Sequence, residues 1–135
     1  MTETSASAAI FPALKYDDAP AAIDWLGRAF GFSKHMVVPD DKGGVAHAEL
    51  RIGGAMIMLG SMGKPDPTNP WTTERQGVYV QITDIDEHYA RAQAAGAKIE
   101  RPLADTPYGA REYSVRDPGG HLWSFGTYDP FAPQE

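Results

Sequence analysis

Cysteine is absent from this sequence of 135 residues. Its absence excludes disulfide bonds, thiolate nucleophiles and zinc sites built on cysteine, and it is what a reducing compartment favours. Positive charge is also scarce: 18 aspartate and glutamate residues outnumber 12 lysine and arginine residues, which gives a net charge of -6. Because nucleic-acid surfaces need clustered positive charge, we expect no nucleic-acid partner.

Long apolar runs and common catalytic motifs are missing as well. The stretch MTETSASAAIFPALKY at 1–16 has no basic residue before Lys15 and only a short apolar run. It therefore matches neither a signal peptide nor a membrane span, and we expect a cytoplasmic protein with no membrane partner. The G-x-G-x-x-G, phosphate-loop and G-x-S-x-G patterns are also absent, so no motif indicates a nucleotide site or a serine hydrolase.

What the sequence does contain is an internal repeat. GGAMIMLGS at 53–61 is similar to GGHLWSFGT at 119–127, an offset of 66 residues in a chain of 135. Each copy opens on Gly-Gly, runs through mostly apolar residues and closes on glycine followed by a small hydroxyl residue. A repeat near half the chain length indicates a tandem duplication, with chance similarity between two α+β halves as the alternative.

The repeat extends to the elements that precede these two stretches. Each half begins with alternating apolar residues, which are typical of a half-buried strand. An aspartate suited to cap a helix follows, Asp18 in the first half and Asp84 in the second. An amphipathic helix comes next and is ended in each half by a glycine. In the first helix the expected buried face comprises Ile23, Leu26 and Phe30.

Three strand-like runs follow each helix, separated by glycine-rich turns such as DDKGG and DPGG. Between the halves, three prolines within six positions predict a connector without regular structure. The sequence therefore predicts a single α+β domain over 1–135, built from two β-α-β-β-β modules. Their expected bounds are about 9–61 for module one, 62–75 for the connector and about 76–127 for module two.

The paired modules, AAIDWLGRAFGF at 21–32 and VRDPGGHLWSFGT at 115–127 together resemble the vicinal oxygen chelate superfamily. That superfamily includes glyoxalase I, extradiol dioxygenases, methylmalonyl-CoA epimerase, and fosfomycin- and bleomycin-resistance proteins. The resemblance covers about residues 9–127. It implies a curved, cup-shaped mixed sheet of the glyoxalase/bleomycin-resistance type. It says less about activity, because this scaffold carries lyases, epimerases, oxygenases and pure binders.

The resemblance also identifies where a metal would bind. In metal-dependent members, His, Glu or Gln ligands stand on the first and fourth strands of each half. Carried over to this chain, those positions fall near Phe11 and Gly77 and at Met58 and Ser124. None of these is a normal ligand for a divalent cation. We therefore expect no metal ligands at the family site and no cofactor.

His47 and Glu49 are the strongest remaining candidates for catalysis or for a displaced metal site. At a spacing of two they share one face of an expected strand. His47 with Glu49 or Glu112 could serve as a general base. The alternative is a polar stripe on a half-exposed strand, so the sequence assigns no catalytic residue.

Strand alternation predicts which side chains line the cup. If the family's ligand positions point inward, so do their neighbours two residues away. The third strand of each module could close the cup, with a facing that depends on strand register. Trp71, in the connector, acts either as a flap or as an anchor that packs the connector down. The expected ligand-binding residues are Phe11, His47, Glu49, Met56, Met58, Tyr79, Gln81, Arg111, Tyr113, Leu122 and Ser124.

This inward set is apolar and aromatic with a few polar points, which suits a small organic molecule. The predicted function is a metal-free binding protein of the glyoxalase/bleomycin-resistance type that sequesters an aromatic or apolar compound. Because relatives of this size usually pair, the resemblance also favours a homodimer. The alternative function is a lyase, isomerase or dioxygenase-like enzyme of the same superfamily that uses His47 and Glu49 in non-standard roles.

Overall fold

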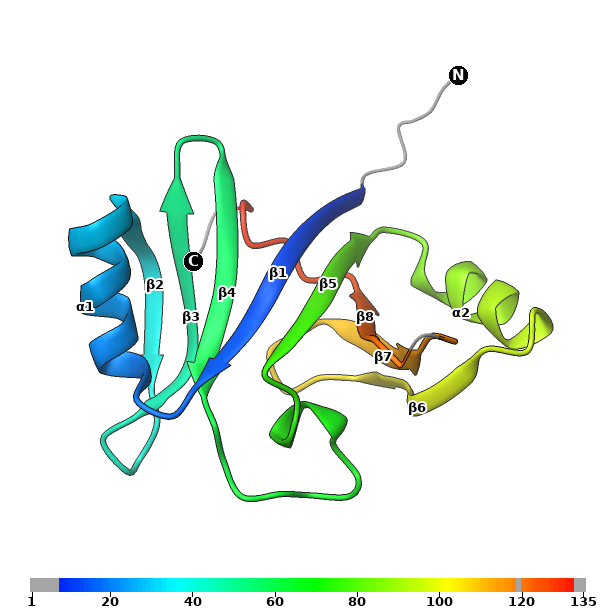
Figure 1. The fold of residues 1–135 in the computed structure, drawn as a ribbon. Coiled ribbons are helices and arrows are strands. Elements are labelled where there is room, and N and C mark those ends of the chain that lie inside the picture. The colour runs from blue at the N-terminus through cyan, green and yellow to red at the C-terminus, as the bar shows by residue number, and fades with distance from the viewer. Residues whose placement is uncertain (1–7, 119, 133–135) are drawn as a thin grey trace.

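A computed structural model describes residues 8–118 and 120–132 (Figure 1). The element order confirms the predicted α+β fold of two β-α-β-β-β modules. Module one comprises β1 Ala8–Tyr16, α1 Ala19–Phe30, β2 Ser33–Pro39, β3 Val45–Ile52 and β4 Ala55–Ser61. After the 3-10 helix η1 Pro70–Thr72, module two comprises β5 Gln76–Ile82, α2 Ile85–Ala94, β6 Lys98–Asp105, β7 Arg111–Arg116 and β8 Leu122–Gly126.

The eight strands form one mixed sheet in the order β2-β3-β4-β1-β5-β8-β7-β6. Within each module the first strand pairs in parallel with the fourth. β1 and β5 pair antiparallel, from Ala8 opposite Ile82 to Leu14 opposite Gln76, and this pairing joins the modules. Figure 1 shows the two halves spreading to either side of β1 and β5, with α1 and α2 at opposite ends. Strands from both modules therefore border the space between them.

The strand register preserves the internal repeat, with one departure. On β4 and β8, Met58 and Ser124 are equivalent positions, and the offset of 66 residues holds. On the next strand, Met58 pairs with Glu49 but Ser124 pairs with Ser114, so β3 and β7 are offset by 65. The cause is the turn: two residues separate β3 from β4, whereas residues 117–121 separate β7 from β8. A shift of one residue moves every side chain of a strand to the opposite face.

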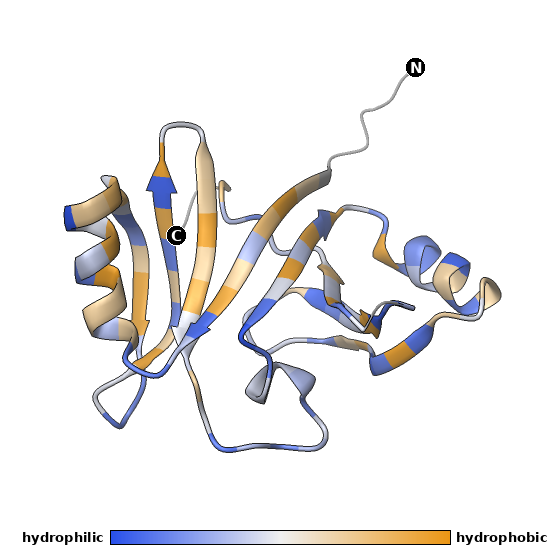
Figure 2. Cartoon of the chain, in the orientation of Figure 1, coloured by the Kyte–Doolittle hydropathy of each residue, from blue (hydrophilic) through white to orange (hydrophobic). Residues whose placement is uncertain are grey.

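Both helices begin at the predicted aspartates. The Asp18 carboxylate accepts a hydrogen bond from the backbone N–H of Ala21 at 3.1 Å, and the Asp84 carboxylate accepts one from Glu87 at 3.4 Å. These bonds satisfy N–H groups that have no partner within the helix. Figure 2 shows hydrophobic residues concentrated along β1 and β4, whereas α2 carries mostly hydrophilic ones. No helix in the described residues is long and apolar enough to cross a membrane.

The buried face of α1 differs from the prediction at one residue. Ile23 and Leu26 are buried against β3 and β4 as expected. Phe30 is instead 56% exposed and contacts Trp25 edge-on, with ring centroids 4.8 Å apart. Phe30 is the last residue of the helix, and Phe32, after the turn at Gly31, packs against the core in its place.

The connector was expected to lack regular structure, yet it contains η1. The side chain of Asn69 accepts a hydrogen bond from the backbone N–H of Trp71 at 3.1 Å and caps this short helix. Pro70 stands at the first helical position, where its fixed φ angle fits and its missing N–H costs nothing. A proline-rich segment therefore still forms one helical turn, and that turn carries Trp71.

Candidate functional site

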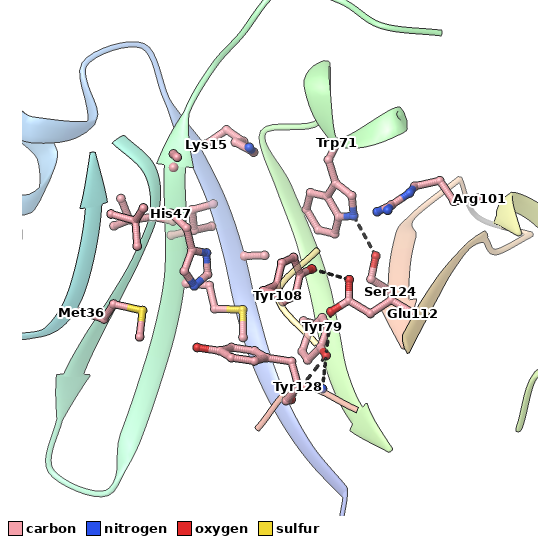
Figure 3. A pocket seen from close by; sticks show the side chains of 17 residues that line it. Lys15, Met36, His47, Trp71, Tyr79, Arg101, Tyr108, Glu112, Ser124 and Tyr128 are labelled. Carbon is pink, nitrogen blue, oxygen red and sulfur yellow. Dashed lines mark hydrogen bonds between the residues drawn. The ribbon is translucent and has the colours of Figure 1, made fainter. Parts of the chain in front are cut away.

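A cavity of about 540 Å³ lies between the two modules (Figure 3). Residues from both modules, from the connector and from the segment after β8 line it. Its polar and aromatic lining residues are Lys15, His47, Trp71, Tyr79, Arg101, Tyr108, Glu112, Ser124 and Tyr128, and its apolar ones are Ala13, Leu14, Met36, Val38, Ala46, Met58, Leu59 and Gly60.

The structure brings most of the predicted site residues to this region. His47, Met58, Tyr79 and Ser124 line the cavity. The others occupy two places around it. Phe11 and Met56 form an apolar layer with Met58 and Tyr79, and Glu49 is fully buried beside His47. Gln81 and Leu122 are also buried but do not line this cavity. Their role in ligand binding stays a prediction.

Arg111 and Tyr113 do not face the cup, so that expectation was wrong. The Arg111 guanidinium pairs with Asp86 and Asp105 at 3.1 Å on the outer surface. Tyr113 is buried in the cluster between α2 and the sheet. The 65-residue offset of β7 explains the error, because it turns the even-numbered residues of β7 toward the cup. Glu112 lines the cavity instead.

Glu112 anchors two aromatic side chains of the cavity wall. The Tyr108 hydroxyl donates to Oε1 at 2.6 Å, and the Tyr79 hydroxyl donates to Oε2 at 3.2 Å. Burial and the nearby Glu112 carboxylate both raise the pKa of each tyrosine. Gly126 makes this arrangement possible, since a Cβ atom there would lie 2.4 Å from Glu112 Cγ. Both phenols therefore remain neutral donors around neutral pH.

Glu49 organises a second cluster on the opposite side of the cavity. Its Oε2 accepts a hydrogen bond from the Tyr128 hydroxyl at 2.5 Å and lies 2.8 Å from His47 Nε2. Its Oε1 has no hydrogen-bond partner in the described part of the chain, and His35 Nε2 is 3.8 Å away. Burial and the bond to Glu49 raise the pKa of Tyr128.

The segment after β8 crosses from module two to module one and was not predicted. Besides the Tyr128–Glu49 bond, the Phe131 ring packs on Phe11 with centroids 5.6 Å apart and lies under the Arg51 guanidinium. The repeat ends at Thr127, and no periodic pattern marks the residues beyond it. Only their tertiary contacts fix this segment.

Trp71 packs down onto the sheet and forms one wall of the cavity. Its indole N–H donates to Ser124 Oγ at 2.7 Å, and Ser124 Oγ lies 2.6 Å from Ser114 Oγ. A Cβ atom on Gly77 would lie 2.3 Å from Trp71 Cη2, so only glycine allows this close approach. Of the two roles considered for Trp71, the structure shows the anchor rather than an open flap.

The four positions that hold a metal in metal-dependent relatives do not fit one here. Phe11 packs in an apolar layer, Gly77 lies under the Trp71 ring, and Met58 offers only a thioether. The Ser124 hydroxyl is already engaged by Trp71 and Ser114. Within residues 8–118 and 120–132, no group of three or more His, Cys, Asp or Glu side chains is placed to hold a metal ion.

Comparison with known proteins identifies the family. The model of the Glyoxalase/Bleomycin resistance protein/Dioxygenase superfamily matches residues 11–125. "Uncharacterized protein Mb0911c" of Mycobacterium bovis is 38% identical over 125 residues, which span 87% of this chain and 82% of that protein.

Two solved structures share the fold. A superfamily member from Vibrio splendidus has a TM-score of 0.70 at 20% identity and covers 89% of this chain and 98% of its own. Methylmalonyl-CoA epimerase from Mycobacterium tuberculosis has a TM-score of 0.68 at 18% identity, with coverages of 93% and 91%. At these identities the likeness shows the fold alone. Through the family match, the chain belongs to the glyoxalase/bleomycin resistance/dioxygenase superfamily.

Proposed function

We propose that this protein binds a small, planar, largely apolar organic molecule in the cavity between its modules, without a metal ion at the family positions. The observation that carries the proposal is a set of aromatic walls held in place by hydrogen bonds. Trp71 is fixed on Ser124, and Tyr79 and Tyr108 are fixed on Glu112. The cavity volume of about 540 Å³ lies within the range of small-molecule sites.

Fixed aromatic walls favour binding because little side-chain freedom is lost when a ligand arrives. The Trp71 indole N–H is already satisfied by Ser124, so no polar group of that side chain is left unpaired when a flat ring covers it. Met36 and Met58, which also line the cavity, are flexible enough to adapt to the outline of the ligand. These features support sequestration of an intact molecule.

A thermal-shift screen with a library of planar organic compounds tests the proposal, because a ligand stabilises the folded state according to its concentration over its dissociation constant. For compounds that raise the melting temperature, Trp71→Ala should weaken binding about tenfold, the value of one lost aromatic contact. Trp25→Ala is the matched control, since Trp25 is exposed on α1 outside the cavity. Unchanged affinity in Trp71→Ala, or no stabilising compound in the library, would contradict the proposal.

A second candidate, a metal-independent lyase or isomerase, is favoured by the geometry of His47. This side chain lines the cavity, and its Nε2 lies 2.8 Å from the buried Glu49 carboxylate, which orients the imidazole. A histidine so held can move a proton of a bound molecule. Product analysis after incubation separates the two functions: conversion lost in His47→Gln with binding retained supports the enzyme, and recovery of unchanged ligand supports the binder.

A further inference from the structure

We infer that the molecule bound in this cavity carries a carboxylate beside its planar body, and that Lys15 and Arg101 hold that group next to Trp71. The inference rests on the proposed function and narrows its ligand to planar aromatic acids. Its starting point is two cationic side chains, one from each module, that line the same largely apolar cavity.

Lys15 and Arg101 are both half-buried, and neither side chain has an ion pair or hydrogen bond in the described part of the chain. Other basic side chains are matched. Arg28, Arg75 and Arg116 each pair with a carboxylate within 3.1 Å. In a protein with a net charge of -6, acidic partners are in excess, so two unpaired cations in one cavity leave a specific place for an anion.

Partial burial of an unpaired cation costs free energy, because the charge loses hydration without gaining a partner. Desolvation accordingly lowers the pKa of Lys15. A bound carboxylate would replace the lost hydration with a charge-assisted hydrogen bond. In Figure 3, Lys15 and Arg101 reach toward the Trp71 indole from different sides, so an acidic group beside that ring meets both.

The one carboxylate that lines the cavity does not take this place. Both oxygens of Glu112 accept hydrogen bonds from tyrosines, and no ion pair within 4.0 Å joins Glu112 to Arg101 among the described residues. Its negative charge repels a second anion and so directs the acidic group of the ligand toward Lys15. The planar body then extends toward Met58 and the tyrosines.

The test is calorimetric titration with two matched compounds, 2-naphthoate and 2-naphthamide, at neutral pH and low salt. They share one ring system and differ in charge. We expect the acid to bind about tenfold more tightly, the effect of one charge-assisted bond in a partly buried site. Lys15→Met and Arg101→Met should each reduce that preference to about threefold or less and leave the affinity for the amide unchanged. Added salt should weaken binding of the acid alone.

Lys34→Met is the matched control, because it removes the same charge from an exposed position on β2 outside the cavity. Melting temperatures of the three variants establish that each is folded. Equal binding of acid and amide, or an acid preference that survives both cavity substitutions, would overturn the inference and leave the proposed binder intact. Binding of the amide alone would do the same. Failure of both compounds to bind at millimolar concentration would count against the inference and the proposed function together.

Discussion

Met58 and Ser124 occupy equivalent positions in the two modules, yet they serve the cavity in different ways. Met58 contributes an apolar surface, whereas Ser124 accepts the hydrogen bond that holds Trp71. Their neighbours on the next strand differ too: Glu49 anchors Tyr128, and Ser114 bonds to Ser124. Divergence at these paired positions has turned a symmetric scaffold into one cavity with chemically distinct sides.

Gly77 is the position where the wall formed by Trp71 is most sensitive to a single methyl group. In Gly77→Ala the new Cβ would overlap the indole, with 2.3 Å to Cη2, and would also crowd the Leu122 carbonyl oxygen at 3.2 Å. We expect a loss of about 1–3 kcal/mol in the free energy of unfolding, the usual cost of overpacking. Chemical denaturation measures this loss, and tryptophan fluorescence reports whether the ring has moved.

Gly63→Ala provides the control for this substitution. A Cβ at Gly63, in the same connector, would meet no atom within 4 Å. Its unfolding free energy and fluorescence should match those of the unmodified protein. If Gly77→Ala behaves like this control, Trp71 is not packed on β5 in solution.

At the scale of whole elements, local rules predicted most of the fold. The aspartate caps, the glycine ends and the strand alternation depend on residues close in sequence, so a single sequence reveals them. The facing of β7 depends on the length of the turn before β8, and the 66-residue repeat at β4 and β8 concealed the one-residue difference. The segment at 127–132 depends on distant contacts with Glu49 and Phe11, which no local pattern records.

Docking of α2 on the sheet is expected to depend on pH through His88. Its Nδ1 lies 2.6 Å from the Tyr113 hydroxyl, and its ring packs on Phe125 with centroids 4.5 Å apart. Burial first, and the Arg91 charge second, lower the pKa of His88 from its ordinary value near 6.5. The unfolded chain therefore binds a proton at a higher pH than the folded chain does, and His88 destabilises the fold as pH falls below about 6.5.

Denaturant titrations at about pH 7.5 and pH 5.5 check this linkage. His88→Gln should show a smaller loss of stability between the two pH values than the unmodified protein. His121→Gln, at an exposed position before β8, should retain the original difference. An equal pH dependence in all three proteins would mean that His88 does not contribute.

Viewed as a whole molecule, the two modules form one binding unit. The β1–β5 pairing joins them along seven residue pairs, and the cavity takes its lining from both. The segment after β8 returns to module one and bonds to Glu49 there. The aromatic wall and the two cations that we assign to the ligand therefore depend on both modules being folded together.

The outer surfaces of the modules differ, and this difference underlies the prediction of a homodimer. Among exposed large hydrophobic side chains in the described residues, six of eight belong to module one: Ile10, Trp25, Phe30, Val37, Val38 and Ile52. β2 is also an end strand of the sheet, so one of its edges has no partner strand within the described residues. Exposed apolar surface and an open edge on one half favour pairing between identical patches across a twofold axis.

Light scattering at micromolar concentration should therefore give about twice the chain mass of 14.6 kDa. Phe30→Glu should shift the mass toward that of one chain, because a carboxylate buried in an apolar contact loses hydration without a partner. Gln93→Glu places the same charge on an exposed position of α2 in module two and should leave the dimer intact. A mass of 14.6 kDa for the unmodified protein would exclude the dimer at that concentration, and dissociation by Gln93→Glu alone would place the interface on module two instead.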